Sequence, residues 1–137
     1  GALEQMVVAE YVTREFDRHV DDLRAGLGRK LDVLVEALSR EFGTSAELFR
    51  PEGGIFLWLK LPDHIDVRSF AASALAQGVA FNPGPEWACD PEAARSYMRL
   101  CFALPSEDTI REGVAELARI THEATGIPAR SANRVRA

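Results

Sequence analysis

Cysteine, histidine and long apolar runs are scarce in this sequence. Its two cysteines, Cys89 and Cys101, form no CxxC pair and no metal-type cluster with the three histidines. We therefore expect two free thiols in a reduced, cytoplasmic protein, and no bound metal. No apolar run approaches the ~18 residues that a membrane-spanning helix needs, and no signal peptide is visible, so we expect no membrane association.

Positive charge is also in short supply, with 16 Lys+Arg against 21 Asp+Glu. The net charge of −5 disfavours a dedicated nucleic-acid binder, which needs a basic surface. One basic cluster lies near the C-terminal end (Arg130, Arg134 and Arg136), and we expect it to belong to a flexible, solvated tail over residues 125–137. A Walker phosphate loop and the motifs GxGxxG, HExxH and GxSxG are missing, so the sequence does not support the chemistries that they carry.

What the sequence does contain begins with a long helical pattern. Residues 2–15 predict a helix that is apolar on most sides, and we expect it to meet a partner domain or subunit. Asp17 is expected to cap a second helix over residues 18–41, whose leucines recur at steps of three and four. Gly26 and Gly28 favour a bend in this second helix.

Turn residues divide the rest of the chain into short elements. Strands are predicted at residues 46–50, 55–61, 79–81 and 97–104, and helices at residues 67–77 and after the capping residue Ser106. The strand at 55–61 is apolar on both faces, so we expect both faces to be covered. The order of elements predicts an α+β fold, in which helices pack on a small, mostly antiparallel sheet.

Arg99 is the residue that most strongly indicates chemistry. Met98, Leu100 and Phe102 alternate onto one face of the predicted strand, so Arg99 shares the other face with Cys101. A charge within an apolar strand is costly unless it is paired, and no acidic partner is adjacent in the sequence. The pattern alone leaves two interpretations open. The arginine either reaches solvent or a structural ion pair, or it binds a carboxylate through two parallel donors.

Four sequence blocks together resemble the small C-terminal domain of class I/II aminotransferases, the fold-type I pyridoxal-phosphate enzymes. The blocks are PEGGIFLW at 51–58, GVAFNPG at 78–84, MRLCFA at 98–103 and IREGV at 110–114. The resemblance extends over residues 3–124. It implies that residues 18–124 form the small domain, and that residues 1–17 form a helix that belongs to the large domain or contacts it.

The resemblance also implies roles for particular residues. The arginine at the position of Arg99 binds the α-carboxylate of the amino-acid substrate in this family. Gly53, Gly54 and Asn82 would lie toward the active-site cleft. The full-length protein would then be a homodimeric enzyme that uses pyridoxal 5'-phosphate to move an amino group between an amino acid and a 2-oxo acid.

One departure from the family pattern limits what this chain is expected to do alone. Neither Lys30 nor Lys60 matches the family's Schiff-base lysine segment, which precedes everything present here. We therefore expect no catalytic, cofactor-binding or metal-binding residue in this chain, no pyridoxal phosphate bound to it, and no activity without the large domain. Two alternatives remain open: the aminotransferase-like effector domain of a winged-helix (GntR/MocR-type) transcriptional regulator, and a free-standing binding module.

Overall fold

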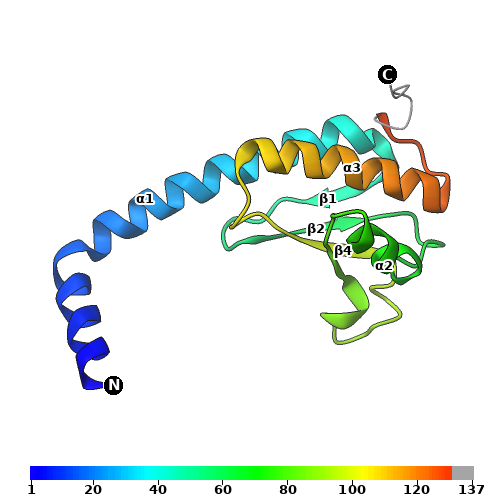
Figure 1. Ribbon diagram of the computed structural model, residues 1–137. Helices are drawn as coiled ribbons and strands as arrows, with labels where there is room; N and C mark the ends of the chain where they lie inside the picture. The colour runs from blue at the N-terminus through cyan, green and yellow to red at the C-terminus, as the bar shows by residue number, and fades with distance from the viewer. Residues whose placement is uncertain (131–137) are drawn as a thin grey trace.

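The computed structural model describes residues 1–130, and α1 (Ala2–Phe42) is its longest element. This helix is continuous, so the predicted break at Asp17 is wrong. Neither glycine nor proline occurs around Asp17, and ion pairs one turn apart, such as Arg14–Glu10 and Arg18–Glu15, bridge this region. Figure 1 shows that α1 changes direction within its dark blue N-terminal part, without a break in the helix.

Four strands form a sheet in the order β1-β2-β4-β3, with every neighbouring pair antiparallel. The strands are β1 (Glu47–Phe49), β2 (Phe56–Lys60), β3 (Asn82–Pro83) and β4 (Tyr97–Cys101). The strand predicted at 79–81 is displaced to Asn82–Pro83. The reason is that the amide of Val79 donates to the carbonyl of Ala74 and closes the preceding helix. The small antiparallel sheet itself is confirmed.

Helices cover one face of this sheet. The C-terminal half of α1 packs side by side with α3 (Glu107–Thr125), and α2 (Arg68–Ala76) lies beside α3 and β3 (Figure 1). The core between these layers contains fully buried side chains from α1, β2 and β4, among them Leu38, Leu57 and Met98. The predicted α+β layout is therefore confirmed.

The other face of the sheet, which we call the open face, is not covered by any helix of residues 1–130. It carries Phe49 of β1, Phe56 and Trp58 of β2, and Tyr97 and Arg99 of β4. The burial pattern alternates along both central strands, with the open-face side chains only half-buried or exposed. The expectation that β2 is covered on both faces is thus wrong for residues 1–130.

The start of α3 agrees with its sequence signal. The hydroxyl of Ser106 accepts a hydrogen bond of 3.1 Å from the amide of Thr109, which confirms the predicted cap of α3. Beyond this helix, Ile127 and Ala129 are buried against the core, so the first part of the expected tail is packed. Residues 131–137, with Arg134 and Arg136, lie outside the described residues.

Candidate carboxylate-binding site

Arg99 lies in the middle of β4, with its side chain on the open face. Antiparallel pairing places it opposite Trp58 of β2 and Asn82 of β3. Because residues directly opposite each other in an antiparallel pair point to the same side, all three side chains project from the open face. The alternation predicted from the sequence is confirmed, with Met98 and Leu100 buried on the opposite side.

Two aromatic rings contact the guanidinium of Arg99. Its central carbon lies 3.8 Å from the centroid of the Phe56 ring and 3.5 Å from the centroid of the Trp87 ring. A guanidinium stacked on an aromatic face is attracted by the ring quadrupole. This arrangement holds the cation at a fixed place on the open face without using an acidic residue.

The hydrogen bonds of Arg99 are incomplete. Its Nη2 donates to Oδ1 of Asn82 at 3.3 Å, while its Nε is buried and has no hydrogen-bond partner. Within residues 1–130, no carboxylate forms an ion pair with Arg99, although many other arginines are paired on the surface. Buried donors are usually satisfied, so the unpartnered Nε of this guanidinium calls for an explanation, and an acceptor from outside the described residues is one.

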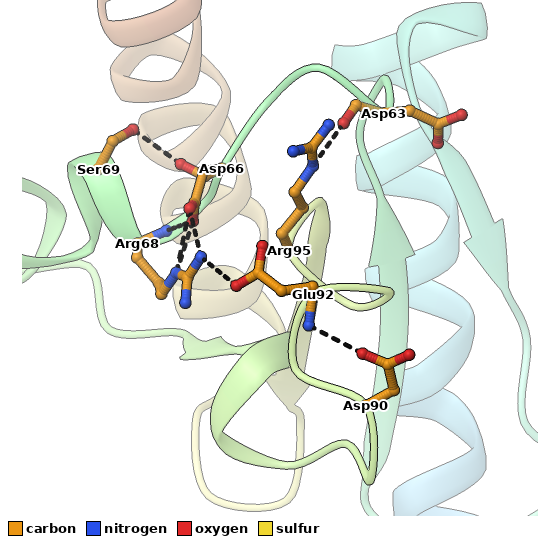
Figure 2. Close-up of polar contacts among 7 residues, drawn as sticks. All are labelled: Asp63, Asp66, Arg68, Ser69, Asp90, Glu92 and Arg95. Carbon is orange, nitrogen blue, oxygen red and sulfur yellow. Dashed lines mark hydrogen bonds and ion pairs between the residues drawn. The ribbon is translucent and has the colours of Figure 1, made fainter.

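The loop that carries Trp87 is anchored at both ends. At its start, the amide of Trp87 donates to the carbonyl of Gly84 across the 3₁₀ turn η2 (Gly84–Glu86). At its far end, Arg68 at the start of α2 makes a bidentate pair with Asp66 and reaches Glu92 at 3.2 Å. Figure 2 shows these side chains converging between α2 and the segment before β4. Trp87 is therefore presented to Arg99 by a tethered loop.

The same cluster shifts the titration of its members. Hydrogen bonds from Arg68 hold the pKa of Asp66 below its usual value, and hydrogen bonds to Asp66 and Glu92 raise the pKa of Arg68. Asp90 adds a further tie, since its carboxylate accepts from the amide of Glu92 at 3.1 Å. These contacts tie the segment before β4 to the start of α2.

The two glycines predicted to line a cleft lie elsewhere. Gly53 and Gly54 border a hollow of about 480 Å³ between the β1–β2 connection and α1, whose lining also includes Arg24 and Phe102. Gly54 has φ +81°, so the turn requires a glycine there. Of the residues predicted for the site, the structure thus brings Arg99 and Asn82 together and leaves Gly53 and Gly54 in a separate hollow.

Two neighbours of Arg99 were not among the predicted site residues. The sequence does carry a signal for Phe56, because the alternation along residues 55–61 puts it on the same side of the sheet as Trp58. Trp87 carried none, since a loop has no periodicity from which the direction of a side chain follows. Its contact with Arg99 arises only from the folding of residues 84–96 over the open face.

Both lysines have partners in the fold. Lys30 of α1 donates to the carbonyl of Ala103 at 2.7 Å, and Lys60 of β2 pairs with Asp63 at 3.0 Å. Cys89 and Cys101 are both free thiols. Among residues 1–130, no helix combines the length and the low polarity that crossing a membrane requires.

Comparisons with known proteins converge on one family. The family described as aminotransferase class I and II matches residues 2–117. Aromatic-amino-acid aminotransferase 1 of Thermococcus litoralis is 31% identical over 124 residues, which is 90% of this chain and 30% of that protein. The crystal structure of α-aminoadipate aminotransferase from Thermus thermophilus, complexed with N-(5'-phosphopyridoxyl)-L-leucine, superposes with a TM-score of 0.80 at 29% identity. That superposition covers 90% of this chain and 32% of the other.

A regulator is also among the relatives. The HTH-type transcriptional regulator YdfD of Bacillus subtilis, whose function is uncharacterised, is 28% identical over 124 residues, covering 90% of this chain and 25% of that protein. The chain therefore spans between a quarter and a third of the length of the relatives that it matches.

Proposed function

Because the chain belongs to the class I and II aminotransferases, which depend on pyridoxal phosphate, we propose that it is the substrate-carboxylate-binding part of such an enzyme. Arg99 is the binding group in this proposal. The observation that carries it is a guanidinium held by aromatic contacts on the open face, with a buried, unpartnered Nε and no acidic partner in residues 1–130. An amino acid or 2-oxo acid would supply the missing carboxylate through two parallel hydrogen bonds.

The chain's own contribution is positioning. The carboxylate of the substrate is held by Arg99, and Asn82 sets the orientation of the guanidinium from the neighbouring strand. Fixing one end of the substrate restricts its rotation, which replaces a search in solution by a defined geometry at the reacting carbon. Gly53 and Gly54 stay in the proposal as residues of the cleft side near α1, where they border a hollow that Arg99 does not line.

Pyridoxal phosphate supplies the chemistry of amino-group transfer in this family. The described residues do not fit its covalent attachment, because Lys30 is held by the carbonyl of Ala103 and Lys60 by Asp63. We propose that a large domain outside this chain attaches the cofactor, and that the chain alone neither binds it nor transaminates. The threefold greater length of the aminotransferase relatives supports this division. Homodimerisation and a cytoplasmic location belong to the same proposal, the latter supported by the two free cysteines.

The test is replacement of Arg99 in the complete protein that carries this chain. We expect Arg99→Ala to lower kcat/KM for amino-acid substrates. The lost transition-state stabilisation should be roughly 2–5 kcal/mol, as for loss of one partner of a buried charge pair. Arg99→Lys is expected to recover part of this loss, since it keeps the charge but not the forked geometry. Arg111→Ala on α3 is the control, because Arg111 is paired with Asp108 on the surface. An unchanged kcat/KM in Arg99→Ala would remove this residue from the proposal.

The alternative function is the effector domain of a transcriptional regulator. The similarity to the HTH-type regulator of Bacillus subtilis favours this alternative, because it covers the same share of the chain as the similarity to the aromatic-amino-acid aminotransferase. In that setting Arg99 would bind a carboxylate as a signal. Sequence-specific DNA binding by the complete protein, with no transamination of any amino acid, would decide for the regulator.

A further inference from the structure

We propose that a hollow on the open face, bordered by Trp58, Tyr97 and Asp90, binds a small organic cation that carries a methylated ammonium group. The hollow measures about 330 Å³, and its lining consists of two aromatic residues, three alanines and a single charged residue, namely Trp58, Tyr97, Ala88, Ala93, Ala94 and Asp90. Arg99 does not line this hollow, so the inference is independent of the proposed function.

Two aromatic rings form the apolar walls of the hollow. The ring centroids of Trp58 and Tyr97 lie 6.2 Å apart and the ring planes meet at 74°, so the two walls stand at nearly a right angle. Tyr97 also stacks on Phe49 of β1 at 6.1 Å, which supports it from the side of the edge strand. Aromatic rings attract cations, and tryptophan attracts them most strongly. A methylated ammonium fits such walls because its methyl groups need no hydrogen-bond acceptor.

Asp90 supplies the negative charge of the hollow. Its Oδ1 accepts hydrogen bonds from the amides of Glu92 at 3.1 Å and Ala93 at 3.2 Å, which fixes the carboxylate on the loop. Figure 2 shows the other carboxylate oxygen directed away from Glu92. Asp66 and Glu92 share Arg68 as a cationic partner, whereas no cation within residues 1–130 pairs with Asp90. A fixed carboxylate without such a partner attracts a cation from solution.

The two cations that β2 and β4 carry on the open face are both engaged elsewhere. Lys60 pairs with Asp63 at 3.0 Å. Arg99 places its guanidinium over Phe56, which lies at the opposite end of the β2–β4 pairing from Tyr97. Neither cation lines the hollow, so its lining in the described part of the chain carries no positive charge. An external cation therefore meets attraction from Asp90 without a competing group in the lining.

The size of the hollow and its chemistry restrict the ligand to a compact molecule. Ligand pockets range upward from about 300 Å³, so a hollow of about 330 Å³ lies at the small end of this range. Two aromatic walls require an apolar body, and one carboxylate requires one positive charge. Choline combines both properties, with a quaternary ammonium on a short chain, and it is therefore a suitable probe.

The experiment measures the binding of choline chloride to the 137-residue chain by NMR of the indole N–H groups. The chain has two tryptophans, and the Trp58 signal is the one that is lost in Trp58→Phe. Dimethylbutanol is the matched probe, because it has carbon in place of the quaternary nitrogen of choline and so keeps the shape without the charge. Sodium chloride at the same concentration controls for chloride and ionic strength. Circular dichroism checks that each variant keeps the fold.

The expected result is binding that depends on the charge of the ligand. In the parent chain, choline should bind at least about fivefold more tightly than dimethylbutanol. Asp90→Asn, whose amide oxygen still accepts from the two backbone amides, should weaken choline binding about threefold and leave dimethylbutanol binding unchanged. Tyr97→Leu should lower the ratio of the two affinities, since it removes one aromatic wall. Glu86→Gln is the control, because Glu86 is an exposed acid of the same segment that does not line the hollow.

Three outcomes would overturn the cation site. The first is equal affinity of the parent chain for choline and dimethylbutanol, a comparison that requires no variant. The second is a Trp58 signal that choline chloride, up to tens of millimolar, shifts no more than sodium chloride does. The third is a loss of choline binding in Glu86→Gln as large as in Asp90→Asn, which would assign the effect to net charge. None of these outcomes bears on Arg99, whose role is tested by the kinetics of the complete protein.

Discussion

A Cβ atom on Gly84 would lie 2.5 Å from the carbonyl oxygen of Ala94 and 2.8 Å from the Cβ of Tyr97. Both contacts are closer than atoms of these types approach each other, so the two segments meet at a point where only a glycine fits. This contact closes the base of the loop that presents Trp87 to Arg99. Residue 84 therefore couples the packing of the loop to the geometry of the candidate site.

We predict that Gly84→Ala destabilises the fold by about 1–3 kcal/mol, the range found when a well-packed site is overfilled. The free energy of unfolding in urea measures the effect. Gly113→Ala in α3 is the matched control, because nothing lies within 4 Å of its added Cβ. It should be neutral or stabilising by up to ~1 kcal/mol. Equal stabilities for the two variants would show that the loop relaxes without cost.

The hydrogen bond from Lys30 to the carbonyl of Ala103 ties α1 to the end of β4. We predict that Lys30→Met, which keeps the apolar stem of the side chain but removes the ammonium, lowers the free energy of unfolding by about 1–2 kcal/mol. The loss arises because the half-buried carbonyl is left without this donor. Arg29→Met, at an exposed position on the same helix, should change the stability much less. A similar loss in both variants would assign the effect to surface charge instead.

The ion-pair cluster around Asp66 predicts a pH dependence of stability. Hydrogen bonds from Arg68 lower the pKa of Asp66 in the folded protein, relative to about 3.9 in an unfolded chain. The resulting stabilisation is complete above the unfolded pKa and is lost as the pH falls through the lower, folded pKa. Asp66→Asn should therefore be less stable than the parent at pH 7, and the difference should shrink below about pH 4.

Urea unfolding of both proteins from about pH 2 to about pH 7, a range that extends to both sides of the unfolded pKa, measures this difference. Asp21→Asn on α1 is the control, because its carboxylate is 77% exposed and its ion-pair contact with Arg24 is 3.9 Å long. A difference between Asp66→Asn and the parent that does not vary with pH would mean that the hydrogen bonds from Arg68 are not formed in solution.

The N-terminal half of α1 exposes a run of large apolar side chains. Met6 is 69% exposed and Val7 is 61% exposed, and Leu3, Val8, Tyr11 and Val12 are also solvent-accessible. We predict that the chain associates at high concentration, and that the double change Met6→Glu and Val7→Glu suppresses this, since a contiguous apolar surface favours association. Analytical ultracentrifugation over a range of concentrations measures the change. Concentration-independent sedimentation of the parent chain would contradict the prediction.

The sequence predicted much of the fold because its strongest signals are local. The steps of three and four from Leu27 to Leu38 form the buried side of α1, and the Ser106 cap begins α3 where it was expected. The cap signal at Asp17 failed for a physical reason. A residue that can cap a helix also tolerates an interior position when its neighbours favour helix and form ion pairs across it.

The candidate site was less predictable than the fold. Arg99 stood out because a single charge interrupted an apolar strand, and the predicted face of that strand is confirmed. The one-sided cover of the sheet did not follow from the pattern, since apolar residues on both faces of β2 do not say whether the second cover lies within the same chain. The stacking of Trp87 depends on how a loop folds back, which no local pattern encodes.

The form of α1 has a mechanical consequence. From Ala2 to its first buried side chain, Leu31, the helix extends roughly 45 Å along its axis, at 1.5 Å per residue, and it changes direction on the way (Figure 1). Lys30 lies at the inner end of this extension and donates to the carbonyl of Ala103, just beyond β4. A partner bound to the N-terminal half of α1 is thus connected through one continuous helix to the end of the strand that holds Arg99.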